Sequence, residues 1–528
     1  MGIESHAFRQ IANAVQGVYT ARRGLALALV TVLGFCLIVN SSWHATPDSA
    51  LYLELGESLA RGDGYQFNGE PHTYVPPGYP ALVAAVAYFF GRDFLAYRVL
   101  MAVMGLLTAG AGYLLILRLC GSDAALIVGG LFAVNHVLLQ NSTYTTSDVP
   151  FALFSLLALH ATLSAASCGR VAFWTILGGL MVGLPPLFRI NGWGLPPVAA
   201  FFLFQSDTDR PLRSRAVVAG LFLLLSLAPS LVWEFHKSTF PISSHEGTYF
   251  TALTGRTIEA HVWIILKSAW EYVQESSYAL TGVSMKTGIL ELICPVLAII
   301  GMARAWAGGD RLLVPLTIVQ FFGLLLSPAG SRYLILLIPG LYLFLGLGLI
   351  SLFATLAGRR GIPAQKFAGS RPLLLGCFAL LAALNVGHNV ITVFHARMPL
   401  ESGGAQSARD LPFFAAARWL KTQPSDTVIL TMHPRVLHYL SGRPTWELVR
   451  SGVPEHQALI EDQDQIRDIV LSRKPAFLFS DKADPARFKK TIEAIESLGL
   501  RLEEVPEATA VLSNRFCLWR ICPGPGCP

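Results

Sequence analysis

The chain has 528 residues, of which 53% are hydrophobic and only 14% are charged, and its mean hydropathy is +0.50. Soluble globular proteins carry about 25% charged residues, so this composition excludes an ordinary soluble protein and indicates lipid as the main solvent. The formal net charge of +6 is not gathered into basic blocks interleaved with aromatic residues, which argues against a nucleic-acid-binding protein.

The charged residues divide the chain into two parts. Residues 405–528 contain 16 Lys and Arg and 15 Asp and Glu, whereas the first 404 residues contain only 24 and 19. We therefore expect a membrane domain over residues 1–404 and a smaller water-soluble domain over residues 405–528.

Eleven apolar runs have roughly the 20-residue length that a helix needs to cross the hydrocarbon core. The run at 79–90 is shorter, which predicts a helix lying at the membrane interface. Arg22 and Arg23 precede the first run without a clean cleavage site after it, so we expect an uncleaved span rather than a signal peptide. The eleven runs lie near residues 24–42, 95–118, 123–140, 149–166, 171–188, 190–205, 215–234, 287–306, 312–328, 333–356 and 372–394.

The distribution of Lys and Arg predicts the topology of these spans. With the N-terminus in the cytoplasm, the inner segments collect most of the cations, and the short outer connections hold only Arg189 and Arg332. Two long loops, at about 43–94 and 235–286, then fall outside, and so does the C-terminal domain. The sequence predicts a multi-pass protein of the cell inner (plasma) membrane with an extracytoplasmic C-terminal domain.

The C-terminal domain is expected to be a small α/β unit. Helices are predicted over 413–421 and 488–498, and strands over 427–432 and 476–480. No nucleotide-binding loop of the Walker type occurs in the sequence. The three cysteines near the C-terminus, Cys517, Cys522 and Cys527, lack the spacing of a zinc site, and whether two of them form a disulfide in an oxidising space stays open.

Two aspartates each begin an apolar helix at the outer membrane boundary. Asp48 follows the first span, and Asp148 precedes the fourth. Helix capping is the simplest interpretation of both, although a capping carboxylate can still project into a cavity. Two carboxylates at one membrane face also suit a general base and a second group that orients the reacting molecule or holds a divalent cation. No His, Cys or carboxylate cluster has metal-ligand spacing, so the sequence assigns no metal or other cofactor, and a divalent ion at the two aspartates stays open.

The segment 74–80, Tyr-Val-Pro-Pro-Gly-Tyr-Pro, lies between these aspartates in the sequence. Three prolines and a glycine in five residues predict a rigid turn that leads into the interfacial helix. A structural turn is the simplest interpretation, and the alternative is a wall for a lipid or sugar ligand.

Arg189 and Arg332 are the exceptions to the charge bias of the short outer connections. Each adjoins an apolar span, so its side chain could extend to lipid headgroups. Because such connections normally avoid cations, an anionic ligand is the alternative. A guanidinium group binds phosphate oxygens in a bidentate manner.

Taken in order, these segments resemble the GT-C class of membrane glycosyltransferases. More narrowly, they are similar to the bacterial relatives of protein O-mannosyltransferases and lipid A aminoarabinose transferases. The resemblance covers roughly residues 24–356 and depends on the order of several short motifs. These are Asp48 with Tyr52, Leu-Ala-Arg-Gly-Asp-Gly at 59–64, Pro-Pro-Gly-Tyr-Pro at 76–80, Arg98, Ser-Asp-Val-Pro at 147–150, and Arg332-Tyr333 followed by Pro339.

The resemblance implies an inverting transfer of a sugar from a polyprenyl-phosphate donor to a lipid, glycan or protein acceptor at the outer membrane face. Asp48 would be the catalytic base and Asp148 the second acidic residue, while Arg332 and Arg189 are the candidates for binding the donor phosphate. The expected partners are these substrates and the membrane lipids, with no nucleic acid. The donor and acceptor cavity would be lined by Tyr52, His72, Tyr74, Pro76, Pro77 and Tyr79.

Two departures limit the assignment to a subgroup. Protein mannosyltransferases have two adjacent acidic residues in the first loop, whereas Ser49 follows Asp48 here, which argues against a peptide acceptor. The aminoarabinose transferases have a Lys before the Pro-Pro pair, where this chain has Val75. The phosphate would then be held by another cation such as Arg332, or the donor differs.

Two other function classes compete with a glycosyltransferase. A surface-polysaccharide polymerase or ligase would also have many spans and long outer loops, but it would not be expected to combine the Asp48 loop with the 76–80 turn. A membrane transporter should show internal repeats and charges within its spans, and the sequence shows neither pattern clearly.

Overall fold

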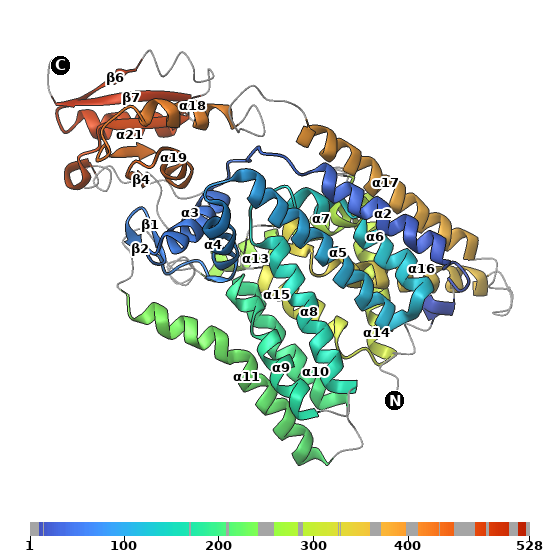
Figure 1. Cartoon of the computed structure of the whole chain (residues 1–528). Helices are drawn as coiled ribbons and strands as arrows, with labels where there is room; N and C mark the ends of the chain where they lie inside the picture. Colours follow the sequence, from blue (N-terminus) through green and yellow to red (C-terminus); the bar gives the residue numbers. More distant parts are fainter. Residues whose placement is uncertain are drawn as a thin grey trace.

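The computed structural model contains a helical domain and a smaller α/β domain (Figure 1). The predicted boundary between them, at residue 404, lies outside the described residues. The structure describes residues 10–13, 15–167, 171–206, 211–240, 258–283, 289–325, 327, 329–359, 371–397, 410–431, 433–447, 470–481, 485–505 and 516–523.

The helical domain places two helices and a short hairpin in the predicted first outer loop, between α2 and α5. The elements in chain order are α2 (Ala21–Leu37), α3 (Pro47–Arg61), β1 (Gln66–Phe67), β2 (Glu70–Pro71), α4 (Gly78–Phe90), α5 (Phe94–Ala124), α6 (Gly130–Ala133), α7 (His136–Asn141), α8 (Asp148–Ser167), α9 (Val171–Val182), α10 (Leu195–Ser206), α11 (Leu212–Ser238), α13 (Ile258–Thr281), α14 (Ile289–Ala307), α15 (Leu313–Leu324), α16 (Ile338–Arg359) and α17 (Arg371–Arg397). Short 3₁₀ turns at Pro185–Leu187, Ile190–Gly194 and Ser331–Leu334 connect some of these helices.

Within the described residues, five helical stretches are long and apolar enough to cross a membrane. They are Phe94–Ala133, Asp148–Ser167, Leu212–Ser238, Ile338–Leu356 and Pro372–Arg397. The other expected runs fall on α2, α9, α10, α14 and α15, which are shorter or are not among these five stretches. The chain is therefore a polytopic helical membrane protein, and the count of eleven spans stays a prediction.

The stretch Phe94–Ala133 contains a reversal of the chain at Gly121, whose φ of 81° and ψ of 179° are not helical. A positive φ favours glycine, because a side chain would be strained there. The π-helical residues Ala125–Gly129 and α6 then pack back against α5. The predicted span 95–118 thus falls on α5, whereas the predicted span 123–140 is not one helix, because α6 ends at Ala133 and α7 begins at His136.

The predicted outer loop 235–286 is partly helical. It contains the last residues of α11 and the whole of α13. One side of α13 exposes Val262, Trp263, Leu266 and Trp270, which lie at helical spacing. An exposed apolar and aromatic stripe of this kind suits the membrane interface.

The α/β domain contains a five-stranded mixed sheet with the strand order β4-β3-β5-β7-β6. Strand β3 pairs in parallel with β4 and β5, and β7 pairs antiparallel with β5 and β6. The predicted strands fall on β3 and β5 and the predicted helices on α18 and α21, whereas the sequence did not predict α19, β4, β6 and β7. Near the C-terminus, Cys522 is disulfide-bonded. The elements are α18 (Leu411–Leu420), β3 (Ile429–Thr431), α19 (Pro434–Ser441), β4 (Thr445–Glu447), β5 (Phe477–Asp481), α21 (Pro485–Glu496), β6 (Leu500–Glu504) and β7 (Phe516–Pro523).

A buried carboxylate joins the two domains where α19 packs on α3. Glu57 of α3, which is 5% exposed, accepts hydrogen bonds from the Tyr439 hydroxyl of α19 at 2.7 Å and the Tyr97 hydroxyl at 2.9 Å. The guanidinium group of Arg92 lies 3.1 Å from the same carboxylate and 3.8 Å from the centre of the Tyr439 ring. A buried charge is tolerated when it is paired and hydrogen-bonded in this way, so the contact fixes α19 to the helical domain.

Two further contacts hold the domains in register. The Asp410 carboxylate, at the start of α18, lies 3.0 Å from Nδ1 of His44 and accepts from the Ala45 N–H at 3.2 Å. In the hairpin that follows α3, the Asn68 side chain donates to the Thr445 carbonyl oxygen at 3.0 Å.

Replacing the buried carboxylate should loosen this interface. We expect Glu57→Gln to lower the stability of the docked domain by about 1–3 kcal/mol, because Arg92 and two hydroxyl groups lose a charged partner. Hydrogen exchange at the amides of α19 should become faster. Glu54→Gln is the control, because it removes a neighbouring carboxylate of the same helix. That carboxylate pairs with Arg61 at 3.3 Å and lies 3.8 Å from Arg92. Equal exchange in α19 for both variants and the wild type would contradict the docking role.

The predicted topology can be tested at two exposed serines. The Tyr19 N–H donates to Asp123, so the Gly121 turn lies at the N-terminal end of α2, away from α3 and the α/β domain. We expect a membrane-impermeant thiol reagent to label Ser425→Cys, in the α/β domain, but not Ser122→Cys in intact cells. Permeabilised cells provide the control for accessibility. Labelling of Ser122→Cys alone from outside would show that the topology is inverted.

Candidate active site

Asp48 is the second residue of α3, and its carboxylate does not cap the helix. The cap is Thr46, whose side chain accepts from the Ser49 N–H at 3.1 Å, while the Ser49 hydroxyl accepts from the Thr46 N–H at 3.1 Å. The capping interpretation of Asp48 is therefore wrong. Because this reciprocal box satisfies the end of the helix, the Asp48 carboxylate is left to contact other groups.

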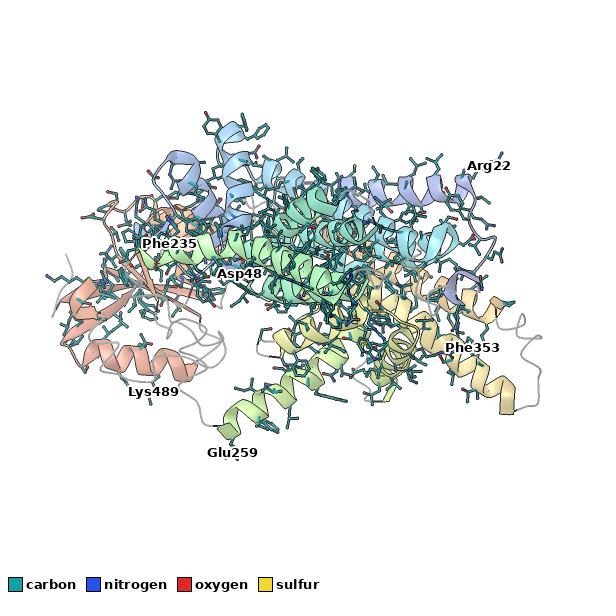
Figure 2. The ribbon with its side chains drawn as sticks, turned by 90° about the horizontal axis from the view of Figure 1, so that it is seen from below. Arg22, Asp48, Phe235, Glu259, Phe353 and Lys489 are labelled. Carbon is teal, nitrogen blue, oxygen red and sulfur yellow. The ribbon has the colours of Figure 1, made fainter. Side chains whose placement is uncertain are left out.

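The Asp48 side chain is 43% exposed and lies between cations from both domains, in the zone where the domains meet (Figure 2). One carboxylate oxygen is 3.4 Å from Nη2 of Arg332, in the 3₁₀ turn before α16. The other oxygen is 3.9 Å from Nη1 of Arg435, in α19. Two residues that the sequence singled out separately, Asp48 and Arg332, are thus neighbours, and Arg435 lies beside them.

Asp148 is the first residue of α8, and 1% of its side chain is exposed. Its Oδ1 atom pairs with Nη1 of Arg189. Its buried Oδ2 atom has no hydrogen-bond partner in the described part of the chain. An unsatisfied buried carboxylate oxygen is costly, so the Asp148 carboxylate depends on Arg189 for its stabilisation.

Tyr333 and Ser147 connect the two ion pairs. The guanidinium groups of Arg189 and Arg332 lie 4.6 and 4.9 Å from the centre of the Tyr333 ring, and Arg332 also donates to the Tyr333 hydroxyl at 2.8 Å. The Ser147 hydroxyl lies 2.9 Å from the Tyr52 hydroxyl and 3.5 Å from Nη1 of Arg189. Both arginines are thus held within one site, and the sequence-based alternative that they extend to lipid headgroups is wrong.

The surroundings fix the charge states of these groups. Burial raises the pKa of the Tyr52 phenol, so it stays protonated and can donate a hydrogen bond. Burial lowers the pKa of the Arg189 and Arg332 guanidinium groups, but nearby groups, Asp148 foremost, raise it by more. The pKa of each guanidinium therefore lies above its usual value. Both arginines therefore provide permanent positive charge.

The predicted cavity residues divide into two groups. Tyr52 reaches the ion pairs, and the fully buried Tyr79 lies behind it at 5.2 Å between ring centres. By contrast, His72 accepts from the Val75 N–H at 3.1 Å and so stabilises the 74–80 turn. Tyr74 packs against the small apolar cluster that includes Val75.

The two prolines of the turn, Pro76 and Pro77, are partly buried and lead directly into α4. Gly78 follows them, and a Cβ atom there would lie 2.6 Å from the Leu187 carbonyl oxygen. This close approach places the start of α4 against the 3₁₀ turn that precedes Arg189. That the turn lines a substrate cavity stays a prediction.

Arg435 and Ser147 were not among the sequence-predicted site residues. Ser147 precedes Asp148 and carries no chemical signal of its own. Arg435 lies in a stretch where charged residues are common, so nothing in its sequence context separates it from solvated surface cations. Arg98, one of the residues on which the resemblance depends, is buried. It is 2% exposed and donates to the Ser42 carbonyl oxygen at 3.0 Å.

The residues present do not form a metal site by themselves. Within the described ranges, no group of three or more His, Cys, Asp or Glu could hold a metal ion. Both candidate carboxylates face guanidinium groups. A divalent cation at Asp48 and Asp148 stays a prediction from the sequence, and we derive no step that uses one.

Comparison with known proteins gives matches at the level of sequence and of fold. The family model of dolichyl-phosphate-mannose-protein mannosyltransferases matches residues 74–233. An uncharacterized protein of Aquifex aeolicus is 28% identical over 211 residues, which cover 39% of this chain and 42% of that protein. The chain thus spans less than half of the length of this relative.

Solved structures match over nearly the whole chain. ArnT from Cupriavidus metallidurans bound to undecaprenyl phosphate superposes with a TM-score of 0.55 and 15% identity, over 95% of this chain and 98% of that one. The oligosaccharyltransferase AglB from Archaeoglobus fulgidus, in complex with an inhibitory peptide and a dolichol-phosphate, gives a TM-score of 0.53 and 12% identity, over 89% and 70%. The chain thus has the same fold as ArnT and AglB, and its residues 74–233 are similar to the mannosyltransferase family, as the resemblance of the sequence to the GT-C class leads one to expect.

The buried ion pair of Asp148 and Arg189 can be tested by a double-mutant cycle. Asp148→Asn should destabilise the protein by about 3–5 kcal/mol, because Arg189 would keep its charge without a partner. Adding Arg189→Gln should recover a large part of this loss, since the buried positive charge is removed as well. Unfolding midpoints of the two single variants and the double variant in one detergent measure the coupling. Strictly additive losses would show that the two groups do not act as a pair.

Proposed function

We propose that this chain is an inverting glycosyltransferase that moves a sugar from a polyprenyl-phosphate donor to a lipid, glycan or protein acceptor at the outer membrane face. The observation that carries the proposal is the Asp48 carboxylate, partly exposed, with the Arg332 guanidinium 3.4 Å away. A base and a phosphate-binding group are the two components that this transfer requires. The GT-C fold supports the same conclusion.

The site residues take complementary roles in this reaction. Asp48 accepts the proton of the acceptor hydroxyl, whose oxygen attacks the anomeric carbon from the face opposite the phosphate. The bond between that carbon and the phosphate oxygen breaks, and its electron pair goes to the phosphate. Arg332 stabilises this developing charge, while the buried Asp148 holds Arg189 and offers Oδ2 to a substrate hydroxyl.

The proposed donor class is supported by what related folds bind. The ArnT structure contains undecaprenyl phosphate, and the AglB structure contains a dolichol-phosphate. In this chain the position before the Pro-Pro pair is Val75, which is buried in an apolar cluster with Leu51 and Leu55 and cannot contact a phosphate electrostatically. The phosphate is therefore assigned to the arginines, with Arg332 first.

The acceptor is further limited by Ser49. The position after Asp48 is acidic in protein mannosyltransferases, but here the Ser49 hydroxyl is engaged in the capping box of α3. This site therefore lacks the second acidic group next to the base, and a lipid or glycan acceptor is favoured over a peptide.

Removing the base should abolish transfer without unfolding the protein. Asp48→Asn leaves the Thr46 cap intact, so the unfolding midpoint should stay near that of the wild type, whereas kcat should fall by about 10²–10⁴. Mass spectrometry of membrane lipids and glycans from cells with and without the chain would identify the product for this assay. Asp63→Asn, an exposed carboxylate paired with Arg61 at 2.7 Å, is the control. Full activity of Asp48→Asn would remove its assigned role.

The phosphate assignment predicts different effects for two substitutions of Arg332. Arg332→Lys keeps the charge but loses the planar guanidinium, so affinity for a polyprenyl phosphate should fall by about tenfold. This loss corresponds to about 1.4 kcal/mol of binding free energy. Arg332→Gln should weaken binding further. Binding is measured with undecaprenyl phosphate in one detergent, with Arg61→Gln as an exposed control. Unchanged affinity in the Gln variant would exclude Arg332 from phosphate binding, and Arg189 would be the next candidate.

A further inference from the structure

The α/β domain contributes a cation to the base of the proposed site. Arg435 is the second residue of α19, and its Nη1 atom lies 3.9 Å from Oδ1 of Asp48. Arg332 approaches the other oxygen of the same carboxylate. Asp48 therefore lies between two guanidinium groups that are separated by more than 100 residues in the sequence and come from different domains.

The docking contacts hold Arg435 in this place. Tyr439 follows Arg435 by four residues, so both side chains lie on one face of α19. That face is directed at α3, because Tyr439 donates to Glu57 while Arg435 approaches Asp48. The Arg435 side chain is 30% exposed, so it borders both the domain interface and solvent.

The ion pairs between the described residues of the site join more cations than carboxylates. Three guanidinium groups, those of Arg189, Arg332 and Arg435, face two carboxylates, those of Asp48 and Asp148. The nearby Glu275 lies on α13, and its carboxylate accepts hydrogen bonds from the backbone and side chain of Ser331, the residue before Arg332. A sugar phosphodiester carries one negative charge, which would make the set of ion pairs neutral.

We infer that Arg435 is a positioning residue that the α/β domain supplies to the active site, where it pairs with Asp48 at rest and balances the charge of the leaving phosphate during transfer. The inference rests on the proposed function. When the acceptor proton moves to Asp48, the carboxylate loses its charge, and the electron pair of the broken carbon–oxygen bond gives the phosphate its second negative charge. The charges of these three guanidinium groups, the two carboxylates and the phosphate then sum to zero both before and after the transfer.

This role predicts that substitution of Arg435 changes mainly kcat, whereas substitution of Arg332 weakens binding of the polyprenyl phosphate. Because Arg435 acts through charge, Arg435→Lys should keep kcat within about threefold of the wild type. Arg435→Gln should lower kcat by on the order of 10- to 100-fold, less than the loss of a direct oxyanion donor, with little change in KM for the donor. Arg418→Gln, which removes an exposed cation of the same domain, is the control for net charge. Hydrogen exchange in α19 checks that the domain stays docked in each variant.

A binding cycle tests the inference without catalysis. Asp48→Asn imitates the protonated base, so it should bind undecaprenyl phosphate, a dianionic product, more tightly than the wild type by about tenfold. Adding Arg435→Gln should remove most of this gain, whereas adding Arg418→Gln should not. Equal affinity of Asp48→Asn and Asp48→Asn/Arg435→Gln would overturn the role of Arg435 and leave the proposed function intact. Absence of undecaprenyl phosphate binding in every variant, the wild type included, would instead contradict the proposed function.

Discussion

Pairing of carboxylates with guanidinium groups is the interaction on which the arrangement of this site depends. Asp148 is almost fully buried, and Asp48 is more than half buried at the junction of two domains. An ionised carboxylate is costly in such surroundings unless a cation and hydrogen-bond donors accompany it. The turns that carry Arg189 and Arg332 must therefore meet the first residues of α3 and α8, and the connections between the spans are positioned accordingly.

The same requirement joins the two domains. Glu57 lies on α3 like Asp48, and its carboxylate is satisfied only when Tyr439 of α19 and Arg92 are both in place. Because α19 docks on α3 through Glu57, Arg435 of the same helix lies close to Asp48. The α/β domain thus becomes part of the wall of the proposed site.

Local helix chemistry keeps the base available for this purpose. Asp at the start of a helix would ordinarily accept backbone N–H bonds, and its carboxylate would then be less able to accept a proton. Here Thr46 and Ser49 satisfy the end of α3, and Pro47 at the first helical position has no N–H to satisfy. The Asp48 side chain can therefore contact Arg332, Arg435 and a substrate.

The sequence by itself determined the membrane class, most helix positions, the short apolar helix over 79–90 and the candidate pair of Asp48 and Asp148. These features follow from local properties, namely hydropathy over about 20 residues, the asymmetry of cations between loops and the order of short motifs. It also singled out Arg189 and Arg332, because a cation in a short outer connection is unusual.

Only the tertiary structure decided which groups meet. Whether Asp48 caps α3 depended on the competing hydroxyl of Thr46, and both choices are compatible with the same residues. That Arg189 pairs with Asp148, and Arg332 with Asp48, depends on how turns distant in sequence fold together. Arg435 could not be identified because a cation in a water-soluble domain is ordinary, and its role arises only from the docking of α19 on α3. Contacts between residues hundreds of positions apart are set by packing of whole domains, a property that no local pattern in the sequence encodes.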